Sequence, residues 1–266
     1  GSDGKVYVVC ANDGLRPFTV LSVDNDSSYD FGPQSWREEA NNSKIIPNTF
    51  GSPSQPKDTL LWPVSVVVDS EENLYLSDEG LDRIWVCNKD GEHLFTWGKH
   101  GSKDGELNRP SGIAVDSDNN IFVVDTMNHR VQKFTNDGQF LMSLGHSGNG
   151  DGQLDRPTGV AVDNQGYIYV ADWGNDRLQV FSGAGDFVAK LTGDGTISKW
   201  GKDKLDANVE MWHEREIAQG IEREKLFWGP IAVSVDAEDR IFVVESARNR
   251  IQVYQKQEPV FFGGRL

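Results

Sequence analysis

Four side chains able to bind an anionic or aromatic molecule recur beside prolines in this sequence. Trp62, Arg109 and Arg156 each stand directly before a proline, and Trp228 stands two residues before another. A guanidinium group binds carboxylates through paired hydrogen bonds and stacks on indole rings. Because three of them occupy equivalent places and Trp228 lies beside the fourth such place, Gly229, we expect them to converge at one end of the molecule and to bind a small anionic or aromatic ligand.

Acidic neighbours of the two arginines allow a different interpretation. Ion pairs of Arg109 with Glu106 and of Arg156 with Asp155 would neutralise both guanidinium groups and only seal that end of the molecule. Catalysis would use the arginines in a third way, to stabilise developing negative charge, and would need a carboxylate or histidine to move protons. The sequence identifies no such proton-transfer residue, so whether the protein is an enzyme stays open.

Three histidines lie in loops, where a metal site would need their ring nitrogens to converge at about 2.0–2.1 Å from the ion. His100 lies two residues after Gly98, whereas His146 lies one residue after the equivalent Gly145, so the two positions do not match. We therefore expect His100, His129 and His146 to be exposed loop residues, with no metal. No glycine-rich phosphate loop, Ser-His-Asp order or Cys-x-x-Cys motif is present, so we expect no cofactor.

The most frequent polar pattern is an acidic residue followed by arginine five residues later. It begins at Asp78, Asp125, Asp172 and Glu245. A carboxylate can accept charge-assisted hydrogen bonds from a guanidinium group and so hold a loop in place. A motif that recurs in every unit is typical of architecture rather than of catalysis, and we expect these pairs to be part of the scaffold.

All these residues are positioned by a repeat of 47 residues. The segments WPVSVVVD, RPSGIAVD and RPTGVAVD bring Pro63, Pro110 and Pro157 to this spacing. Each is followed by three more runs rich in β-branched and aromatic residues, separated by Gly, Asn and Asp turns, which predicts a four-stranded antiparallel meander. A fixed period of this size is typical of a repeat fold, and we expect one all-β domain over residues 1–266. The readable units are residues 3–51, 58–98, 107–145, 154–193 and 228–266.

The period is interrupted at three places. The last unit is preceded by 26 additional residues, and residues 198–227 are rich in Glu, Lys, Arg and Ala, which predicts a helical insertion broken near Gly220. Trp212 and Ile217 of this insertion are candidates for a partner surface if they form an exposed apolar patch. The first unit contains a polar loop at about residues 33–48 and begins on a second strand, so its innermost strand is absent.

The segments NHRVQKF, NDRLQVF and RNRIQVY, together with RPSGIAVD and RPTGVAVD, resemble NHL-repeat β-propellers. The resemblance implies a propeller of four-stranded blades, used as a scaffold that holds a ligand at the mouth of its central channel or a protein on its loops. Relatives are commonly six-bladed, and this sequence is expected to form five blades, or six if the native protein has further sequence. The resemblance also implies an alternative, a channel-mouth lyase or lactone-type hydrolase. Amidating lyases of this type hold zinc with histidines near the channel, and the first strands here carry none.

Composition limits the possible partners. The formal net charge is −15, so we expect no nucleic-acid partner, because binding to phosphate backbones depends on basic groups. No run approaches the roughly 20 apolar residues of a membrane helix, so we expect no membrane insertion, and no targeting signal is visible. Cys10 and Cys87 lie in apolar strand-like runs, where a free thiol packs as a small hydrophobe. A binding scaffold is the leading hypothesis, followed by the enzyme and by a subunit of a larger assembly.

Overall fold

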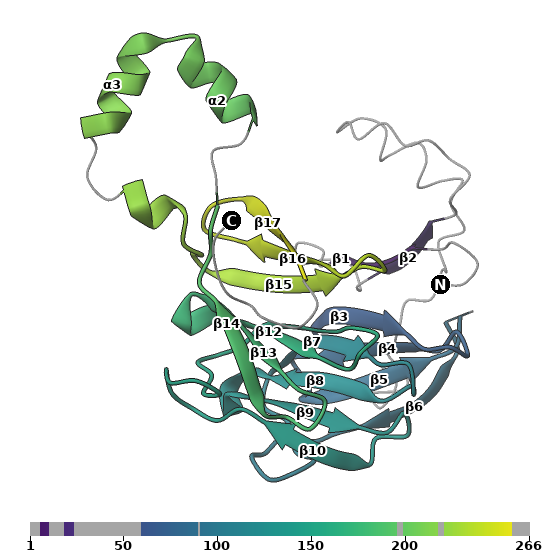
Figure 1. Cartoon of the computed structure of the whole chain (residues 1–266). Helices are drawn as coiled ribbons and strands as arrows, with labels where there is room; N and C mark the ends of the chain where they lie inside the picture. Colours follow the sequence, from purple (N-terminus) through teal and green to yellow (C-terminus); the bar gives the residue numbers. More distant parts are fainter. Residues whose placement is uncertain are drawn as a thin grey trace.

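A computed structural model describes residues 6–10, 19–23, 60–89, 91–195, 199–217 and 221–256. Within these ranges the chain is built mainly of short antiparallel strands that form successive blades (Figure 1). Three blades are four-stranded meanders in which each strand pairs with the next, and a fourth blade has three described strands. The prediction of an all-β propeller with four-stranded blades is therefore confirmed in its main feature.

The blades follow the 47-residue period. The first blade consists of β3 (Pro63–Val68), β4 (Leu74–Asp78), β5 (Arg83–Cys87) and β6 (His93–Trp97). The second consists of β7 (Pro110–Val115), β8 (Ile121–Asp125), β9 (Arg130–Phe134) and β10 (Phe140–Leu144). The third consists of β11 (Gly159–Val162), β12 (Ile168–Asp172), β13 (Arg177–Phe181) and β14 (Phe187–Leu191). The fourth consists of β15 (Pro230–Val235), β16 (Arg240–Glu245) and β17 (Arg250–Gln255).

An aspartate closes the first hairpin of each blade. Asp163 is typical: its Oδ1 accepts the backbone N–H groups of Gln165 and Tyr167, both at 2.9 Å. Asp69, Asp116 and Asp236 accept the N–H groups two and four residues further on in the same way. This is the side-chain capping of a turn that the sequence predicted at these positions.

Adjacent blades pack through apolar side chains and through close backbone contacts. The cluster between the second and third blades includes Phe122, Val124, Val131, Val160, Ile168 and Val170, all buried. The inner strands β3, β7, β11 and β15 contact one another in this order. A Cβ added at Gly112 would lie 2.6 Å from the carbonyl oxygen of Thr158, so only glycine allows β7 and β11 to approach this closely.

The first predicted unit is not a blade within the described residues. β1 (Val6–Cys10) and β2 (Thr19–Val23) form a two-stranded sheet. β1 contacts β3 as the second strand β4 contacts β7, which agrees with the predicted start on a second strand. The described residues thus contain four blades, and the prediction of five or six is wrong for them, because β1 and β2 pair only with each other. The predicted loop at residues 33–48 lies outside the described residues.

The predicted helical insertion is present before the fourth blade. It contains α2 (Lys199–Asp206), α3 (Val209–Ile217) and a short 3-10 helix, η3 (Ile221–Glu224), and Gly220 lies outside the described residues. The two α-helices project away from the blades (Figure 1). Neither is long and apolar enough to span a bilayer, and the same holds for every other helix in the described ranges.

Candidate functional site

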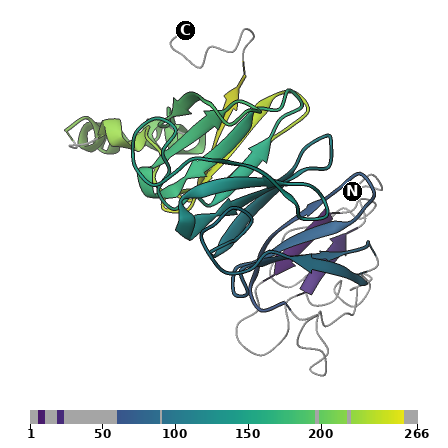
Figure 2. The same cartoon turned by 90° about the horizontal axis from the view of Figure 1, so that it is seen from below.

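The geometry of the meander gathers the candidate residues on one face. Successive strands of a blade run in opposite directions, so the residues before each inner strand lie at the same end as the loop between the second and third strands. We call this end the linker face, and the opposite end, with the aspartate-closed hairpins, the turn face. Figure 2 shows the blades following one another in an arc from the N-terminal strands to β15–β17.

A buried carboxylate anchors each blade at the linker face. Asp172 is fully buried, and it accepts hydrogen bonds from the backbone N–H of Asp155 at 2.7 Å, from Arg177 Nε at 2.8 Å and from Asn175 Nδ2 at 2.9 Å. The equivalent carboxylate of Asp125 binds the same set of groups in the second blade. The pairing of each acid with the arginine five residues later is confirmed as part of the scaffold.

The arginines of these pairs also hold the linkers between blades. Arg177 donates to the carbonyl oxygens of Asn149, Gly150 and Gln153, each at 2.8 Å. Arg250 likewise donates to the carbonyl oxygens of Glu224 and Leu226. Charge-assisted bonds to several carbonyl groups fix a linker that has no regular structure of its own. These side chains are therefore not available for ligand binding.

Three of the four residues before the inner strands share an unusual backbone conformation. Arg109, Arg156 and Gly229 have φ angles of 54°, 47° and 63°, in the left-handed region. The backbone N–H of each is accepted by a side chain of the preceding blade: Asp82 Oδ1 at 2.6 Å, His129 Nδ1 at 3.1 Å and Asp176 Oδ1 at 2.7 Å. The fold therefore fixes the backbone at these positions through a contact that does not involve their side chains.

Arg109 extends from this position to an acidic partner. Its side chain is 61% exposed, and its Nε donates to Glu79 Oε1 at 2.6 Å. Glu106, the partner considered from the sequence, pairs instead with Lys99 at 3.3 Å. Trp62, at the equivalent position of the first blade, has its backbone N–H bound to Asp78 and its indole 59% exposed.

Arg156 lies in a denser arrangement. Its Nε donates to Asp155 Oδ1 at 3.1 Å, and its guanidinium carbon lies 4.7 Å from the ring centroid of Trp173. The hydrogen bond from Arg156 holds the pKa of the Asp155 carboxyl below its ordinary range, and it raises the pKa of Arg156. Asp155 Oδ1 also lies 3.4 Å from His129 Nδ1. Sequence reasoning missed Trp173, although a tryptophan after the blade acid departs from the threonine and serine found there in the second and fourth blades.

Trp228 completes the linker face at the fourth blade. Its backbone N–H donates to Glu245 Oε2 at 2.8 Å, and its indole is 57% exposed. The guanidinium carbon of Arg248 lies 5.7 Å from the indole centroid. All four candidate residues thus lie on the linker face, where Arg156 is brought together with Trp173, while Trp62 and Trp228 belong to the first and the fourth blade.

The candidate partner surface on the insertion is described only in part. Trp212 of α3 is half-buried, and its Nε1 donates to Asp206 Oδ1 at 3.0 Å. Met211, beside it, is exposed. Ile217 ends α3, and its side chain lies outside the described residues. The expected patch of Trp212 and Ile217 stays a prediction.

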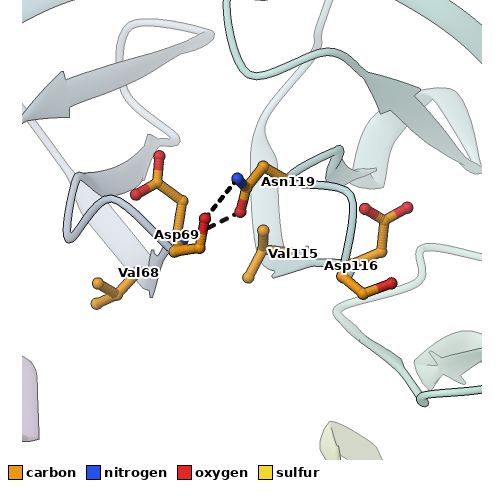
Figure 3. A pocket seen from close by; sticks show the side chains of 7 residues that line it. Val68, Asp69, Val115, Asp116 and Asn119 are labelled. Atoms are coloured by element: carbon orange, nitrogen blue, oxygen red, sulfur yellow. Dashed lines mark hydrogen bonds between the residues drawn. The ribbon is translucent and has the colours of Figure 1, made fainter. Parts of the chain in front are cut away.

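The turn face contains a hollow of about 390 Å³ between the first and second blades (Figure 3). Its lining is Val68, Asp69, Ser70, Val115, Asp116, Ser117 and Asn119. Asn119 crosses it to accept the backbone N–H of Ser70 at 3.0 Å and to donate to its hydroxyl at 2.7 Å. Asp69 binds the hydroxyl of Tyr75 as well as its own turn, so its carboxylate already has partners. Among the described residues no group of three or more His, Cys, Asp or Glu side chains could hold a metal ion.

Comparison with known proteins identifies the repeat. The NHL repeat model matches residues 107–134 and 154–181, which lie in the second and third blades. No curated protein matches the sequence. The two matched blades are NHL repeats, and the described blades have the architecture of a β-propeller.

Solved structures share the fold at low sequence identity. A streptogramin B lyase structure matches with a TM-score of 0.52 and 13% identity, over 97% of this chain and 67% of that one. A catalytically inactive virginiamycin B lyase from Staphylococcus aureus with quinupristin matches with a TM-score of 0.49 and 11% identity, over 97% of this chain and 72% of that one. At 13% identity, the likeness to the streptogramin B lyase structure supports the propeller fold and says nothing about activity.

Proposed function

We propose that this NHL-repeat β-propeller is a binding scaffold whose linker face holds an aromatic anion, either a free small molecule or such a group on a protein partner. The observation that carries the proposal is the pair of exposed arginines in left-handed backbone positions, of which Arg156 stacks on the exposed indole of Trp173. Arg109 and Arg156 keep long side chains where the fourth blade has Gly229. A left-handed conformation is strained for any residue except glycine, and strain of this kind concentrates at functional sites.

The side chains of the linker face have the chemistry of a recognition surface. Tryptophan and arginine are enriched among the residues that dominate binding energies at interfaces, and tryptophan buries a large area with little loss of conformational freedom. Trp173 holds the Arg156 guanidinium against its ring, which orients the arginine before any ligand arrives. Trp62 and Trp228 add apolar area at the first and fourth blades.

The acidic residues of this face favour binding over catalysis. Glu79 is paired with Arg109, Asp155 with Arg156, and Asp176 accepts the N–H of Gly229. A general acid must give a proton to the substrate and a general base must accept one, and carboxylates whose oxygens are held in ion pairs and backbone hydrogen bonds are poorly placed for either task. The lyase or lactone-type hydrolase therefore ranks second, since the streptogramin B lyase shares only the fold.

The backbone strain provides a test that separates binding from stability. Arg109→Gly and Arg156→Gly remove the guanidinium groups and at the same time relieve a left-handed residue, so both variants should melt at or slightly above the temperature of the wild type. Asp239→Gly is the matched control, because Asp239 has a φ of 59° and lies on the turn face.

Binding is measured by NMR with two probes. The free probe is 2-naphthalenesulfonate, and the peptide probe is a short chain that ends in tryptophan with a free carboxylate. We expect the indole signals of Trp173 and Trp228 to shift on binding, and we expect the double Arg→Gly variant to bind about tenfold more weakly while Asp239→Gly binds normally. Equal binding by the double variant, or absence of binding by both probes, would reject the proposed site.

A further inference from the structure

At one position of the repeat, one blade carries a histidine where two others carry an aspartate. It lies just before the third strand, and it holds Asp82, His129 and Asp176 in the first three blades. All three residues are left-handed, with φ angles of 52°, 55° and 51°. All three accept the backbone N–H of the residue before the next inner strand. His129 therefore replaces a carboxylate in the contact that joins the second blade to the third.

An imidazole accepts this hydrogen bond over a narrower pH range than a carboxylate does. A carboxylate accepts a hydrogen bond throughout the range from about pH 5 to 8, because its ordinary pKa lies near 4. A ring nitrogen accepts only while it carries no proton. The contact between Arg156 N–H and His129 Nδ1 thus requires a neutral ring with its proton on Nε2. Histidine is the side chain that ordinarily changes its charge between pH 5 and 8.

The charged groups around His129 determine which contacts change when its ring gains a proton. Asp155 Oδ1 lies 3.4 Å from Nδ1, and Arg156 holds the same carboxylate through Nε and Nη2 at 3.1 and 3.2 Å. On the loop of His129 itself, Arg130 is turned toward Asp125 at 2.8 Å. Gly145, which packs against the carbonyl group of His129, brings no charge. His129 is 25% exposed, so solvent can deliver the proton.

We propose that His129 is a pH-dependent switch that controls whether Arg156 is free to bind an anion. A proton from solvent adds to Nδ1, and the N–H of Arg156 then faces a second donor and loses its acceptor. The imidazolium pairs with Asp155 and competes with the guanidinium of Arg156 for that carboxylate. The guanidinium of Arg156 stays over the ring of Trp173, and because it loses its hydrogen bonds to Asp155 it can pair with an anion from solvent. This last consequence rests on the proposed function, whereas the switch itself does not.

The switch is tested on the unliganded full chain by NMR titration from pH 8 to pH 5. We expect the ¹⁵N shifts of His129 to show the Nε2–H tautomer at pH 8. The backbone amide proton of Arg156 should then move with the same midpoint as the His129 ring. The amide proton of Gly229, which is bound by the carboxylate of Asp176, should stay constant over this range. An Nδ1–H tautomer at pH 8, or a constant Arg156 amide shift, would overturn the proposal.

A matched variant removes the titration and keeps the acceptor. His129→Asn places a neutral amide oxygen at Nδ1, and asparagine tolerates the left-handed conformation, as Asn249 does at the equivalent position with φ of 47°. In this variant the Arg156 amide shift should not change with pH. A titration that persists unchanged in His129→Asn would assign the effect to another group and reject the switch.

The link to binding is measured with 2-naphthalenesulfonate, which stays charged at both pH values. Its affinity should rise about two- to fivefold from pH 7.5 to pH 5.5 in the wild type and stay constant in His129→Asn. If the probe binds at neither pH while the amide titrates, the proposed function fails and the switch stands. If the probe binds equally at both pH values, the coupling between the switch and Arg156 is refuted.

Discussion

The carboxylate of Asp172 allows a quantitative test of how the blades are held together. It is fully buried, and its partner Arg177 is 7% exposed at 2.8 Å. Asp172→Asn removes the charge and turns an amide NH₂ group toward donors, so Arg177 is left buried without a counter-ion. Breaking a buried ion pair from one side costs about 3–5 kcal/mol of unfolding free energy. For a chain of this length, about 2–4 °C per kcal/mol corresponds to a fall in Tm of about 6–20 °C.

An exposed pair between the third blade and the linker before it provides the control. Lys190 and Asp151 lie 2.6 Å apart, and their side chains are 45% and 52% exposed. Water screens such a pair, so Asp151→Asn should cost less than about 1 kcal/mol. Thermal melts followed by circular dichroism compare the two variants under one set of conditions.

A third variant tests whether the loss comes from the unpaired charge. Asp172→Asn combined with Arg177→Met removes both partners, and the double variant should be more stable than the sum of the two single losses predicts. If Asp172→Asn melted as close to the wild type as Asp151→Asn does, the buried carboxylate would not be the anchor that its hydrogen bonds indicate.

Three further outcomes follow from contacts described above. Gly159→Ala should lower the unfolding free energy by about 1–3 kcal/mol in denaturant titrations, because the added Cβ would lie 2.9 Å from a backbone carbon of β15. An unchanged denaturation midpoint would contradict this close approach. Burial raises the pKa of the Cys87 thiol to about 12, so a thiol reagent at pH 8 should label its peptide only after the protein is unfolded in guanidinium. Mass spectrometry detects the label, and labelling of the native protein would contradict the burial of this thiol. Arg156→Gly should raise the pKa of the Asp155 carboxyl toward about 3.9 in a ¹³C NMR titration, since the arginine's hydrogen bond is the main cause that lowers it. The pair of Asp155 and Arg156 stabilises the fold above the ordinary carboxyl pKa, and this contribution is lost as the pH falls through the lowered pKa. The unfolding free energy of Arg156→Gly should therefore not show this fall with pH. An unchanged pKa of Asp155 in the variant would refute the assignment.

The fold could be predicted where the sequence repeats, because equivalent residues face equivalent partners. The segments RPSGIAVD and RPTGVAVD begin two blades with the same strand pairing and the same turn chemistry. The number of blades was not predictable in the same way. A strand-like run shows that a segment can join a sheet, but β1 and β2 pair only with each other among the described residues. Blade number depends on partners that no single run specifies.

The sequence predicted which residues lie on the linker face, but it did not predict which residues they pair with. The spacing of prolines brought Arg109 and Arg156 to one face, but the ion pair of Arg109 with Glu79 joins residues 30 positions apart through a left-handed turn that the sequence does not specify. His129 was expected to be an exposed loop residue, and its contact with Arg156 was missed. Aligning the blades by their acid–arginine pairs would have revealed it, because His129 then stands at the position of two aspartates.

Arg109, Arg156 and Gly229 show how one backbone position can serve the scaffold and still vary in function. The contact common to all three is the one from the preceding blade to the backbone N–H, so the fold constrains the φ angle and allows the side chain to vary. Glycine satisfies that constraint with the least strain, and an arginine there adds a group that the scaffold does not need. The acceptor is constrained differently, because it must carry a lone pair. A carboxylate carries lone pairs on both of its oxygens, whereas an imidazole nitrogen carries one only when it bears no proton. Under the proposed function and the proposed switch, substitutions of the donor residue would change what the linker face binds, and substitutions of the acceptor would change the pH range over which the junction between blades holds.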